Sequence, residues 1–363
     1  MKNSLQTRVN KIKLCLTTLR EANWSFSEDE NTQQFCLSRL ERLTENQLLE
    51  QKIHRELGGK YWHAPKRLLI IVSEKDPLGT LEALCAAYLI GSKIRLKARI
   101  SINYLQQVKR ILSLDDEECE IIDWQSHLQN DQQILSGVDT VLLAGGEALI
   151  QHYRQITPPH IKLVELGPKI SGMAIIGKQL PAIELILYDI ALFHQQVCSS
   201  PRFILLDNPL AAEALYHQLI TTLDHLPILS DNLRLQGISQ FREHRFTYSL
   251  SAPDKPSVYS EKTGWGVTYQ TEFAPQAWLT QGFQLVVASI EDSLKQAQTL
   301  WPGRLQTLGY FGDLDSLSLQ QYSFTRYCPI GRMHQRPIHA PHDGFFMLSA
   351  LVNFISKEEN GDK

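Results

Sequence analysis

The feature that most constrains the fold is an unbroken apolar run, RLLIIV, at residues 67–72. A strand with one face in solvent alternates polar and apolar side chains, so this run predicts a strand buried on both faces. Similar segments follow at 140–144 (TVLLA) and 161–166 (IKLVEL), with helix-like segments between them. Strands that alternate with helices indicate a parallel α/β sheet with right-handed crossovers.

The same alternation extends along most of the chain. Before it, leucine, isoleucine and valine recur at three- and four-residue steps and predict a helical segment over residues 1–60. We expect a helix over 81–91, a strand over 93–100, a helix over 104–114, a strand over 119–124, a helix over 181–196, a strand over 202–207 and a helix from Pro209. The stretch 230–280 is rich in Ser, Thr, Tyr and Gly and predicts strands and loops, and a final apolar helix is expected from Phe345.

Composition narrows the class of protein. The 363 residues carry a formal net charge of −3, so no global positive field attracts nucleic acid or anionic lipid. The six cysteines are sparse and unevenly spaced, which argues against a disulfide framework. The polar first residues lack a signal-peptide core, and the longest apolar run, LCAAYLI, is far shorter than the roughly 20 residues that span a bilayer. We therefore expect a cytoplasmic protein without a membrane span.

Two common nucleotide-binding motifs are absent. Neither GxGxxG nor GxxxxGK[ST] occurs, so a standard Rossmann dinucleotide site and a P-loop are both disfavoured. Gly145 and Gly146 instead follow a predicted strand and open a predicted helix. Glycines let a backbone approach a ligand closely, and a helix N-terminus favours an anion. A plain strand-to-helix turn would contain the same pair.

Two other segments carry reactive groups. Cys198 stands in VCSSPR between a predicted helix and a predicted strand, where small neighbours favour an accessible thiol. The alternative is an inert core cysteine, which is our interpretation of the other five. Glu165 ends a predicted strand in ELGPK, the position at which α/β folds place site residues; the alternative is a surface carboxylate.

The C-terminal loop gathers Cys328, His334, His339, His342 and Asp343. Clusters of these residue types raise the question of a metal site. Their spacing fits no standard zinc pattern and prolines interrupt the histidines, so we expect no metal. A loop beside the mouth of a ligand site and ordinary surface histidines are the remaining interpretations.

Taken in order, these segments resemble the aldehyde dehydrogenase superfamily, and within it the acyl-CoA reductase family typified by the fatty-acid reductase of bacterial luminescence. VELGPKIS is similar to the glutamate motif of the superfamily, with Glu165 at the glutamate. HQQVCSSPR is similar to its cysteine motif, with Cys198 at the nucleophile and Gln196 at the glutamine. The ending IGRMHQRPIHAPHDGFF is similar to the acyl-CoA reductase subgroup.

Two upstream segments extend the resemblance to the cofactor site. The run DPLGTLEALCAAYLIGSKIRLKARIS places Lys97 at the lysine that contacts the adenosine ribose of the cofactor. LLAGGEALI places Gly145 and Gly146 at the glycine turn beside the pyrophosphate. The run from Lys97 to Arg99 holds two cations and no carboxylate where NAD-preferring members place an acid, so we expect NADPH.

The resemblance implies an aldehyde-dehydrogenase-like fold of two parallel α/β lobes with the active site between them. We expect a helical N-terminal segment (1–60), a nicotinamide-cofactor-binding lobe (61–165), a catalytic lobe with Cys198 (166–330) and a C-terminal loop and helix (331–363). The chain departs from the superfamily at its oxyanion-binding asparagine, where Lys75 and Asp76 stand, and at Pro168, which replaces a glycine. Loss of an oxyanion donor costs about 3–4 kcal/mol unless another group, such as Lys75 or the Cys198 backbone N–H, replaces it.

The chemistry implied is reduction of a fatty acyl thioester, carried by coenzyme A or an acyl carrier protein, to an aldehyde. Cys198 forms the acyl-enzyme, and Glu165 helps to deprotonate it or relays a proton. Two other functions stay open: an aldehyde-oxidising dehydrogenase, which Glu165 permits, and a non-catalytic subunit that binds an acyl carrier or a partner, which the missing asparagine favours. The resemblance is also compatible with an acyl-activating enzyme as partner and with a homo-oligomer.

Overall fold

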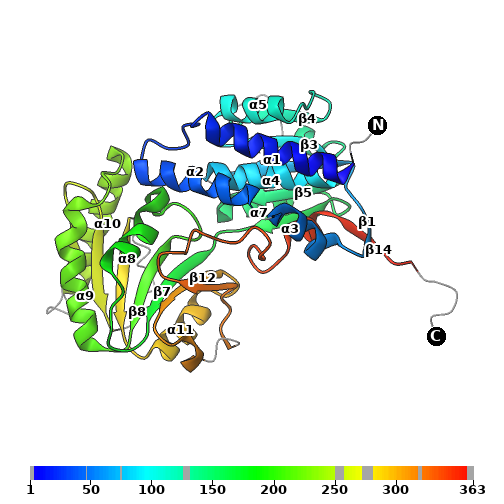
Figure 1. Cartoon of the computed structure of the whole chain (residues 1–363). Coiled ribbons are helices and arrows are strands. Elements are labelled where there is room, and N and C mark those ends of the chain that lie inside the picture. Colours follow the sequence, from blue (N-terminus) through cyan, green and yellow to red (C-terminus); the bar gives the residue numbers. More distant parts are fainter. Residues whose placement is uncertain are drawn as a thin grey trace, which may run out of the picture. The chain divides into compact units, whose positions relative to one another are not determined.

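The computed structural model describes residues 4–45, 47–73, 76–125, 131–249, 257–271, 281–317 and 321–357. The chain forms two compact units, coloured by sequence in Figure 1. The first unit comprises Met1–Pro168 and Pro337–Lys363, and the second comprises Lys169–Arg336. The C-terminal segment thus returns to the unit that the N-terminal half of the chain builds.

A five-stranded parallel sheet forms the centre of the first unit. Its strands are β2 (Arg67–Val72), β3 (Lys93–Ala98), β4 (Cys119–Asp123), β5 (Thr140–Ala144) and β6 (Lys162–Leu166), in the order β4-β3-β2-β5-β6. The predicted apolar run is β2, the central strand, and its residues 68–72 are all buried. Leu69 and Ile71 pack against α6 (Asp131–Leu135) and α7 (Glu147–Ile156), which cover one face of the sheet. The predicted parallel sheet is therefore confirmed.

Helices on the other side complete the first unit. They include α1 (Leu5–Glu21), α2 (Glu30–Thr44), α3 (Leu48–Leu57), α4 (Pro77–Ile90) and α5 (Ile102–Ile111). Helices α1, α2 and α4 lie side by side (Figure 1), and α4 contacts β2 and β3. Near the end of the chain, α12 (Met347–Leu351) packs on α3, and β14 (Asn353–Ile355) pairs antiparallel with β1 (Tyr61–His63). The N-terminal helical segment that the sequence predicts is confirmed.

A seven-stranded sheet forms the centre of the second unit, in the order β13-β12-β7-β8-β11-β10-β9. The strands are β7 (Ile170–Ile175), β8 (Pro201–Leu206), β9 (Val258–Tyr259), β10 (Gly266–Gln270), β11 (Gly282–Val287), β12 (Leu305–Phe311) and β13 (Arg326–Pro329). All neighbours are parallel except β9 and β10. Along β8, Ile204 and Leu206 join one apolar cluster, and Phe203 and Leu205 join another. Both faces of this sheet are therefore covered.

Helices contribute side chains to both of these apolar clusters, where they pack against the side chains of the sheet. The first cluster includes residues of α8 (Ile183–Ala191) and α9 (Pro209–Thr222), and the second includes residues of α11 (Ile290–Leu300). The remaining helical elements of the described part of this unit are η1 (Leu192–Gln195), η2 (Leu223–His225), α10 (Asp231–Ser249) and η3 (Leu314–Ser316). In the ranges that the structure describes, no helix combines the length and the apolar character needed to cross a bilayer.

Three sequence predictions about elements are wrong in part. The helix expected over 181–196 begins at Ile183 and ends at Ala191, because the next residues turn in the left-handed sense. Within the stretch 230–280, strands are found at β9 and β10, but the stretch begins with α10, whose polar composition hid a helix that buries Ile238 and Phe241. The helix expected from Phe345 is only α12, and β14 follows it.

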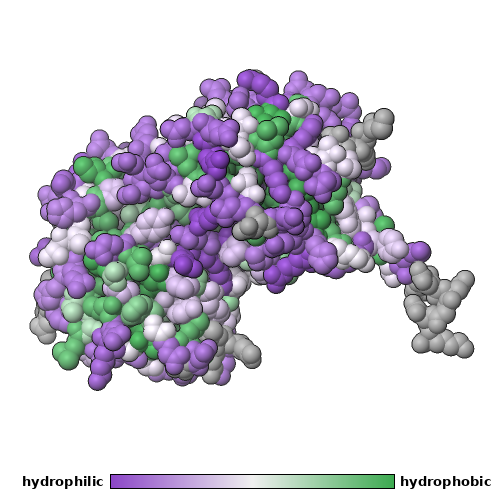
Figure 2. Space-filling view, viewed as in Figure 1, coloured by the Kyte–Doolittle hydropathy of each residue, from purple (hydrophilic) through white to green (hydrophobic). Residues whose placement is uncertain are grey.

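The surface is mainly polar on the face that Figure 2 shows, with apolar residues interspersed. Large exposed apolar side chains in the second unit include Leu210, Ile228, Leu235 and Phe246, on α9, α10 and the segment between them. Scattered apolar side chains are normal on protein surfaces. These four side chains therefore do not by themselves mark a functional site.

Candidate active site

The order of the five-stranded sheet reverses between β2 and β5. The chain leaves β2 for β3 and β4 and then crosses back to β5, and ligands of open parallel sheets bind beyond the carboxyl ends of the strands at such a point. Ser73 is the first residue beyond β2, and its N–H donates to the carbonyl of Ala144 at 2.8 Å. On the other side, the N–H of Arg99 donates to the carbonyl of Val72 at 3.0 Å. Ser73 thus lies between the ends of β3 and β5.

The predicted glycine pair lies at this edge. A Cβ atom at Gly145 would stand 2.0 Å from Ser73 Oγ and 2.8 Å from Leu149 Cδ2, so a side chain there would force both neighbours to move. Gly146 is the N-cap of α7, and a Cβ atom on it would meet nothing within 4 Å. Glu147 follows in the first turn of α7, where its charge opposes an anion at this helix end. Gly145 is therefore closely packed against Ser73 and Leu149, and Gly146 leaves open space.

The predicted cations Lys97 and Arg99 both lie over Trp124. Lys97 Nζ is 5.7 Å and Arg99 Cζ is 4.9 Å from the centroid of its ring. Sequence reasoning found no acid directly after Lys97, but the fold brings Asp131 within 3.8 Å of Lys97 Nζ.

The carboxylate of Asp131 has other partners as well. It accepts from Tyr153 Oη at 2.9 Å and pairs with His152 Nε2 at 2.7 Å. Burial acts to raise the pKa of Asp131, but hydrogen bonds from His152 and Tyr153 outweigh this effect and hold the pKa below its ordinary value. The acid beside Lys97 is thus held ionised by neighbouring side chains of its own unit.

Glu165 lies on β6, opposite Leu143 of β5. Both of its carboxylate oxygens accept from the side chain of Arg154 on α7, at 2.8 Å to Nε and 2.5 Å to Nη2. A general base needs a lone pair directed at the proton that it removes. With both oxygens engaged by Arg154, Glu165 is an ion-pair partner in this arrangement. The structure brings it to the same sheet as Lys97 and Gly145, whereas Cys198 belongs to the second unit.

Cys198 lies in the turn between η1 and β8, and its carbonyl accepts a hydrogen bond from Ser171 Oγ at 2.7 Å. It is half-buried, whereas the other five cysteines are buried, and none of the six forms a disulfide. Burial raises the pKa of Cys15 to about 12 and the pKa values of Cys119 and Cys328 to about 11. Burial also raises the pKa of the Cys36 and Cys85 thiols well above their ordinary value. The buried thiols are held in the unreactive protonated form.

A strained turn precedes Cys198. Phe193, His194 and Gln195 have φ values of 56°, 50° and 59°, a conformation that costs L-residues roughly 1–2 kcal/mol each. The buried side chain of Gln195 holds this turn, since its Nε2 donates to the carbonyls of Pro201 at 2.7 Å and Gly282 at 2.8 Å. Its Oε1 accepts from the N–H of Gly282 at 2.9 Å. The buried glutamine of this segment is thus Gln195, which directly precedes Gln196 of the predicted motif.

Arg202 is a functional candidate that sequence reasoning missed. Its guanidinium donates to the carbonyl of Gln195 at 2.6 Å and to Gln195 Oε1 at 3.2 Å. Burial lowers the pKa of Arg202 to about 10, and negative charge on Cys198 acts in the opposite direction. Arg202 thus places a positive charge close enough to Cys198 for the two groups to interact electrostatically. The signal in the sequence was a charged residue at the start of an otherwise apolar strand.

The C-terminal loop meets the cysteine turn through His334. Nδ1 of this buried ring lies 2.9 Å from Ser199 Oγ, and Nε2 lies 2.8 Å from the carbonyl oxygen of Asp189. The carboxylate of Asp189 accepts from the N–H groups of Gly331 at 2.6 Å and Met333 at 3.1 Å. Burial raises the pKa of Asp189 to about 7, although these two bonds act to lower it.

The other members of the predicted C-terminal cluster have different surroundings. Cys328 is buried on β13 of the second unit, whereas His339, His342 and Asp343 belong to the first unit. There His342 pairs with Phe345 in an isolated bridge and lies 4.0 Å from Asp343, and His339 lines a pocket. Over the residues with assigned structure, no three His, Cys, Asp or Glu side chains are placed to hold a metal ion.

Lys75 and Asp76 stand where the superfamily has its oxyanion-binding asparagine. Lys75 lies outside the described residues. Asp76 caps α4 by accepting from the N–H of Leu78 at 2.9 Å and pairs with Arg39 at 3.1 Å. A carboxylate accepts hydrogen bonds and cannot donate one to an oxyanion. Asp76 is therefore not a replacement for the missing asparagine.

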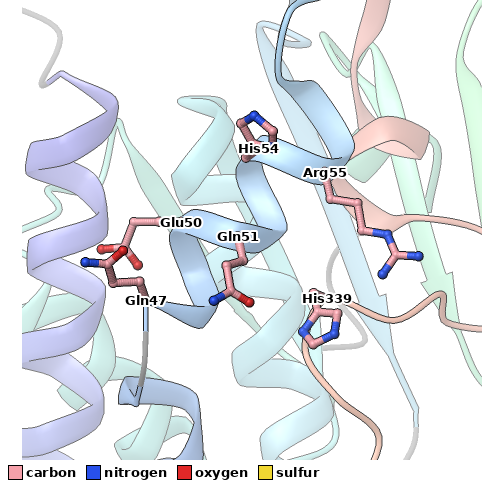
Figure 3. Close-up of a pocket in the computed structure, with 6 residues that line it drawn as sticks. All are labelled: Gln47, Glu50, Gln51, His54, Arg55 and His339. Atoms are coloured by element: carbon pink, nitrogen blue, oxygen red, sulfur yellow. The ribbon is translucent and has the colours of Figure 1, made fainter.

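A surface pocket of about 510 Å³ lies along α3 and contains none of the predicted site residues (Figure 3). Five of its lining residues come from α3 and its N-cap and one from the C-terminal segment: Gln47, Glu50, Gln51, His54, Arg55 and His339. Glu50 also pairs with Lys13 of α1 at 2.6 Å. Fatty chains are held in apolar clefts, and this lining is polar, so the pocket does not fit an acyl chain.

Comparisons with known proteins agree on family and fold. Residues 83–354 match the family model described as Acyl-CoA reductase (LuxC). A comparison with curated proteins finds none that matches.

Solved structures of aldehyde dehydrogenases share the fold at low sequence identity. A salicylaldehyde dehydrogenase from Pseudomonas putida has a TM-score of 0.75 and 11% identity, covering 99% of this chain and 87% of its own. Aldehyde dehydrogenase 21 from Physcomitrella patens has a TM-score of 0.74 and 10% identity, covering 97% and 84%. The glyceraldehyde-3-phosphate dehydrogenase GapN from Methanocaldococcus jannaschii, complexed with NADP, has a TM-score of 0.72 and 10% identity, covering 98% and 90%. The predicted aldehyde-dehydrogenase-like fold is therefore confirmed.

Proposed function

This chain belongs to the acyl-CoA reductase (LuxC) family, and from that premise we propose that it reduces a fatty acyl thioester to an aldehyde with NADPH. The acyl group is held on Cys198 during the reaction. The observation that carries the proposal is the setting of this thiol. It is the one half-buried cysteine of six, it follows a strained left-handed turn, and it interacts with the half-buried cation Arg202.

The residues of the chain account for the acyl transfer. The thiolate of Cys198 attacks the thioester carbonyl, the bond from the carbonyl carbon to the sulfur of the carrier breaks, and the carrier thiolate leaves and takes a proton from solvent. Arg202 favours the attacking thiolate. When bound, NADPH supplies the hydride that the acyl carbonyl accepts. The bond from carbon to Cys198 then breaks, so the aldehyde leaves and the thiolate is restored.

The carboxyl edge of the five-stranded sheet fits a phosphorylated dinucleotide. Lys97 and Arg99 provide two cations over Trp124, and Gly146 leaves space for a ligand beside the end of β5. Because Glu147 opposes an anion at the start of α7 and Asp131 already pairs with Lys97, we assign phosphate recognition to Arg99 rather than to that helix end or to Lys97. The M. jannaschii enzyme of the same fold is described in complex with NADP.

Glu165 supports reduction better than aldehyde oxidation. Oxidation ends with water cleaving the acyl-enzyme, which needs a base to activate the water. Both oxygens of Glu165 are engaged by Arg154, whereas thioester reduction needs no water. We therefore give Glu165 a role in relaying a proton only after Arg154 has moved. The substrate is a fatty acyl chain on coenzyme A or an acyl carrier protein, and an acyl-activating enzyme is the partner that would supply it.

The test separates acylation from reduction. Purified protein is mixed with a series of acyl-CoA esters, without NADPH, and the peptide that contains Cys198 is examined for an added acyl mass. NADPH is then added, and its oxidation and the aldehyde formed are followed. We expect a Cys198 adduct and stoichiometric aldehyde from wild type and from Cys328→Ala, a buried control, and neither from Cys198→Ala. Equal turnover by Cys198→Ala would exclude the mechanism, and no adduct with any acyl-CoA or acyl carrier protein would favour a non-catalytic binding subunit.

A further inference from the structure

His334 connects three segments that surround Cys198. Its Nδ1 lies 2.9 Å from the hydroxyl of Ser199, the residue directly after Cys198. Its Nε2 lies 2.8 Å from the carbonyl oxygen of Asp189 on α8. Its ring centroid is 5.7 Å from that of Phe193, the first residue of the left-handed turn. One buried ring therefore contacts the chain on both sides of Cys198.

The two hydrogen bonds determine where the protons lie. A backbone carbonyl only accepts, so Nε2 carries the hydrogen that is shared with Asp189. In the neutral ring, Nδ1 is then an acceptor, and the Ser199 hydroxyl donates to it. The hydroxyl hydrogen of Ser199 is thus committed to His334.

Asp189 holds the segment that carries His334. Its carboxylate accepts the N–H groups of Gly331 and Met333, just before His334 in the chain. The backbone carbonyl of the same residue accepts from the imidazole. Side chain and main chain of Asp189 thus fix His334 from two directions.

We propose that His334 is a positioning residue for the nucleophile: by accepting the Ser199 hydroxyl while bonded to Asp189, it fixes the turn that carries Cys198. The inference rests on the proposed function, in which Cys198 is the nucleophile. His334 does not touch the reacting atoms in this account. It acts through Ser199.

Two amide variants separate the two nitrogens of the ring. In His334→Asn the amide oxygen reaches the place of Nδ1 and still accepts from Ser199, but the bond to Asp189 is lost. In His334→Gln the amide nitrogen reaches the place of Nε2 and still donates to Asp189, but the acceptor for Ser199 is lost. Ser199→Ala removes the same bond from the other side, and Ser199→Thr keeps a hydroxyl as its control.

Two readouts keep this test distinct from the test of function. The first is the rate of acyl transfer from acyl-CoA to Cys198, and the second is the rate of Cys198 alkylation by iodoacetamide, which needs no acyl substrate. We expect His334→Gln and Ser199→Ala to slow acyl transfer by roughly tenfold or more, since small misplacements of a reacting group have effects of this size. The double variant should be no slower than either, and His334→Asn and Ser199→Thr should stay within about threefold of wild type.

The alkylation rate should group the variants in the same way. A wild type that is never acylated would contradict the proposed function, while the alkylation pattern would still decide the role of His334. Equal effects of His334→Asn and His334→Gln, or a larger effect of His334→Asn, would overturn the proposal, because His334 would then act only through Asp189. Where a His334 variant does not fold, the contrast between Ser199→Ala and Ser199→Thr decides, and equal rates for that pair would overturn it.

Discussion

Arg202 bears directly on the reactivity of Cys198. It is a half-buried cation, and Nη1 and Nη2 of its guanidinium donate to one glutamine, Gln195, in the turn that precedes the cysteine. A cation that is partly removed from water needs partners that compensate for its lost hydration. The acceptors here are an amide oxygen and a carbonyl, which carry no net charge, so these two bonds do not neutralise Arg202.

We predict that the positive charge of the side chain at position 202, more than its shape, increases the reactivity of the Cys198 thiolate. Arg202→Gln should lower the rate of Cys198 alkylation at neutral pH by roughly tenfold, which corresponds to a free-energy difference of about 1.4 kcal/mol. Arg202→Lys keeps the charge and one donor and should stay closer to wild type. The measurement is the rate of iodoacetamide labelling of the Cys198 peptide. Equal rates for the two variants would contradict an electrostatic role.

Asp189 gives a prediction about pH and stability. Its pKa is raised to about 7 in the folded protein from an ordinary 3.8, so the folded state keeps a proton that the unfolded state releases. The stability from this group is complete below about pH 4 and is lost as the pH rises through about 7. As the pH rises across that range, wild type loses stability and Asp189→Asn does not. The free energy of unfolding of Asp189→Asn, measured with urea, should therefore rise relative to that of wild type by up to roughly 4 kcal/mol. A difference between the two proteins that stays constant with pH would refute this.

Among single residues, the sequence identifies those whose chemistry is written in a local motif. Cys198 and Glu165 stand out because a thiol among small residues and a carboxylate at a strand end are unusual in themselves. Arg202 and His334 could not be assigned in this way, because their roles depend on contacts with Gln195 and Ser199 that form only on folding. The same holds for Asp131, which reaches Lys97 from a separate segment.

Among elements, the turn from Phe193 to Gln195 has the strongest consequence for the site. It ends α8 earlier than the apolar sequence predicts, and it leads the chain toward Cys198. Because none of the three residues is glycine, the conformation is held by tertiary contacts and not by local preference. The hydrogen bonds of Gln195 to Pro201 and Gly282 provide them.

We predict that glycine is preferred over alanine in this turn. His194 has φ 50° and ψ 37°, so His194→Gly should be more stable than His194→Ala by about 1 kcal/mol, since glycine adopts this conformation without steric cost. His217, an exposed residue of α9, is the matched control. There the order should reverse, with alanine favoured by about 1 kcal/mol. Thermal unfolding of the four variants measures both differences, and the same order at both positions would contradict the assigned strain.

The elements that the sequence predicts are those whose pattern needs no tertiary information. The run at 67–72 predicts β2 because only a fully buried strand tolerates so many consecutive apolar residues. Helix α10 is not predicted from the sequence because most of its surface is polar and only a few residues, such as Phe241, reach the core. The strand β7 was missed because glycine and serine interrupt its apolar pattern, although a Cβ at Gly172 would overlap the ring of Phe203 on β8.

For the whole molecule, the return of the C-terminal segment to the first unit is the feature that no local pattern reveals. Its attachment includes a buried ion pair. Lys52 and Glu56 of α3 are both buried and bonded to each other, and Glu56 Oε2 accepts from the N–H of Leu348 at 2.6 Å. Ser349 Oγ donates to the carbonyl of Glu56 at 2.8 Å, and Lys162 Nζ donates to the carbonyl of Val352 at 2.9 Å. One carboxylate thus caps α12 and neutralises a buried lysine.

We predict that loss of this carboxylate releases the C-terminal segment. Glu56→Gln leaves Lys52 buried without a counter-charge and should destabilise the first unit by about 3–5 kcal/mol. Glu117→Gln is the control, because Glu117 pairs with Lys93 on the surface and its loss should change stability little. Hydrogen exchange should become faster in α3, α12 and β14 of the Glu56 variant and stay unchanged in β8 and β11, whose apolar clusters lie wholly within the second unit. Equal acceleration in both units would show that this ion pair supports the whole chain and not the return of its C-terminal segment.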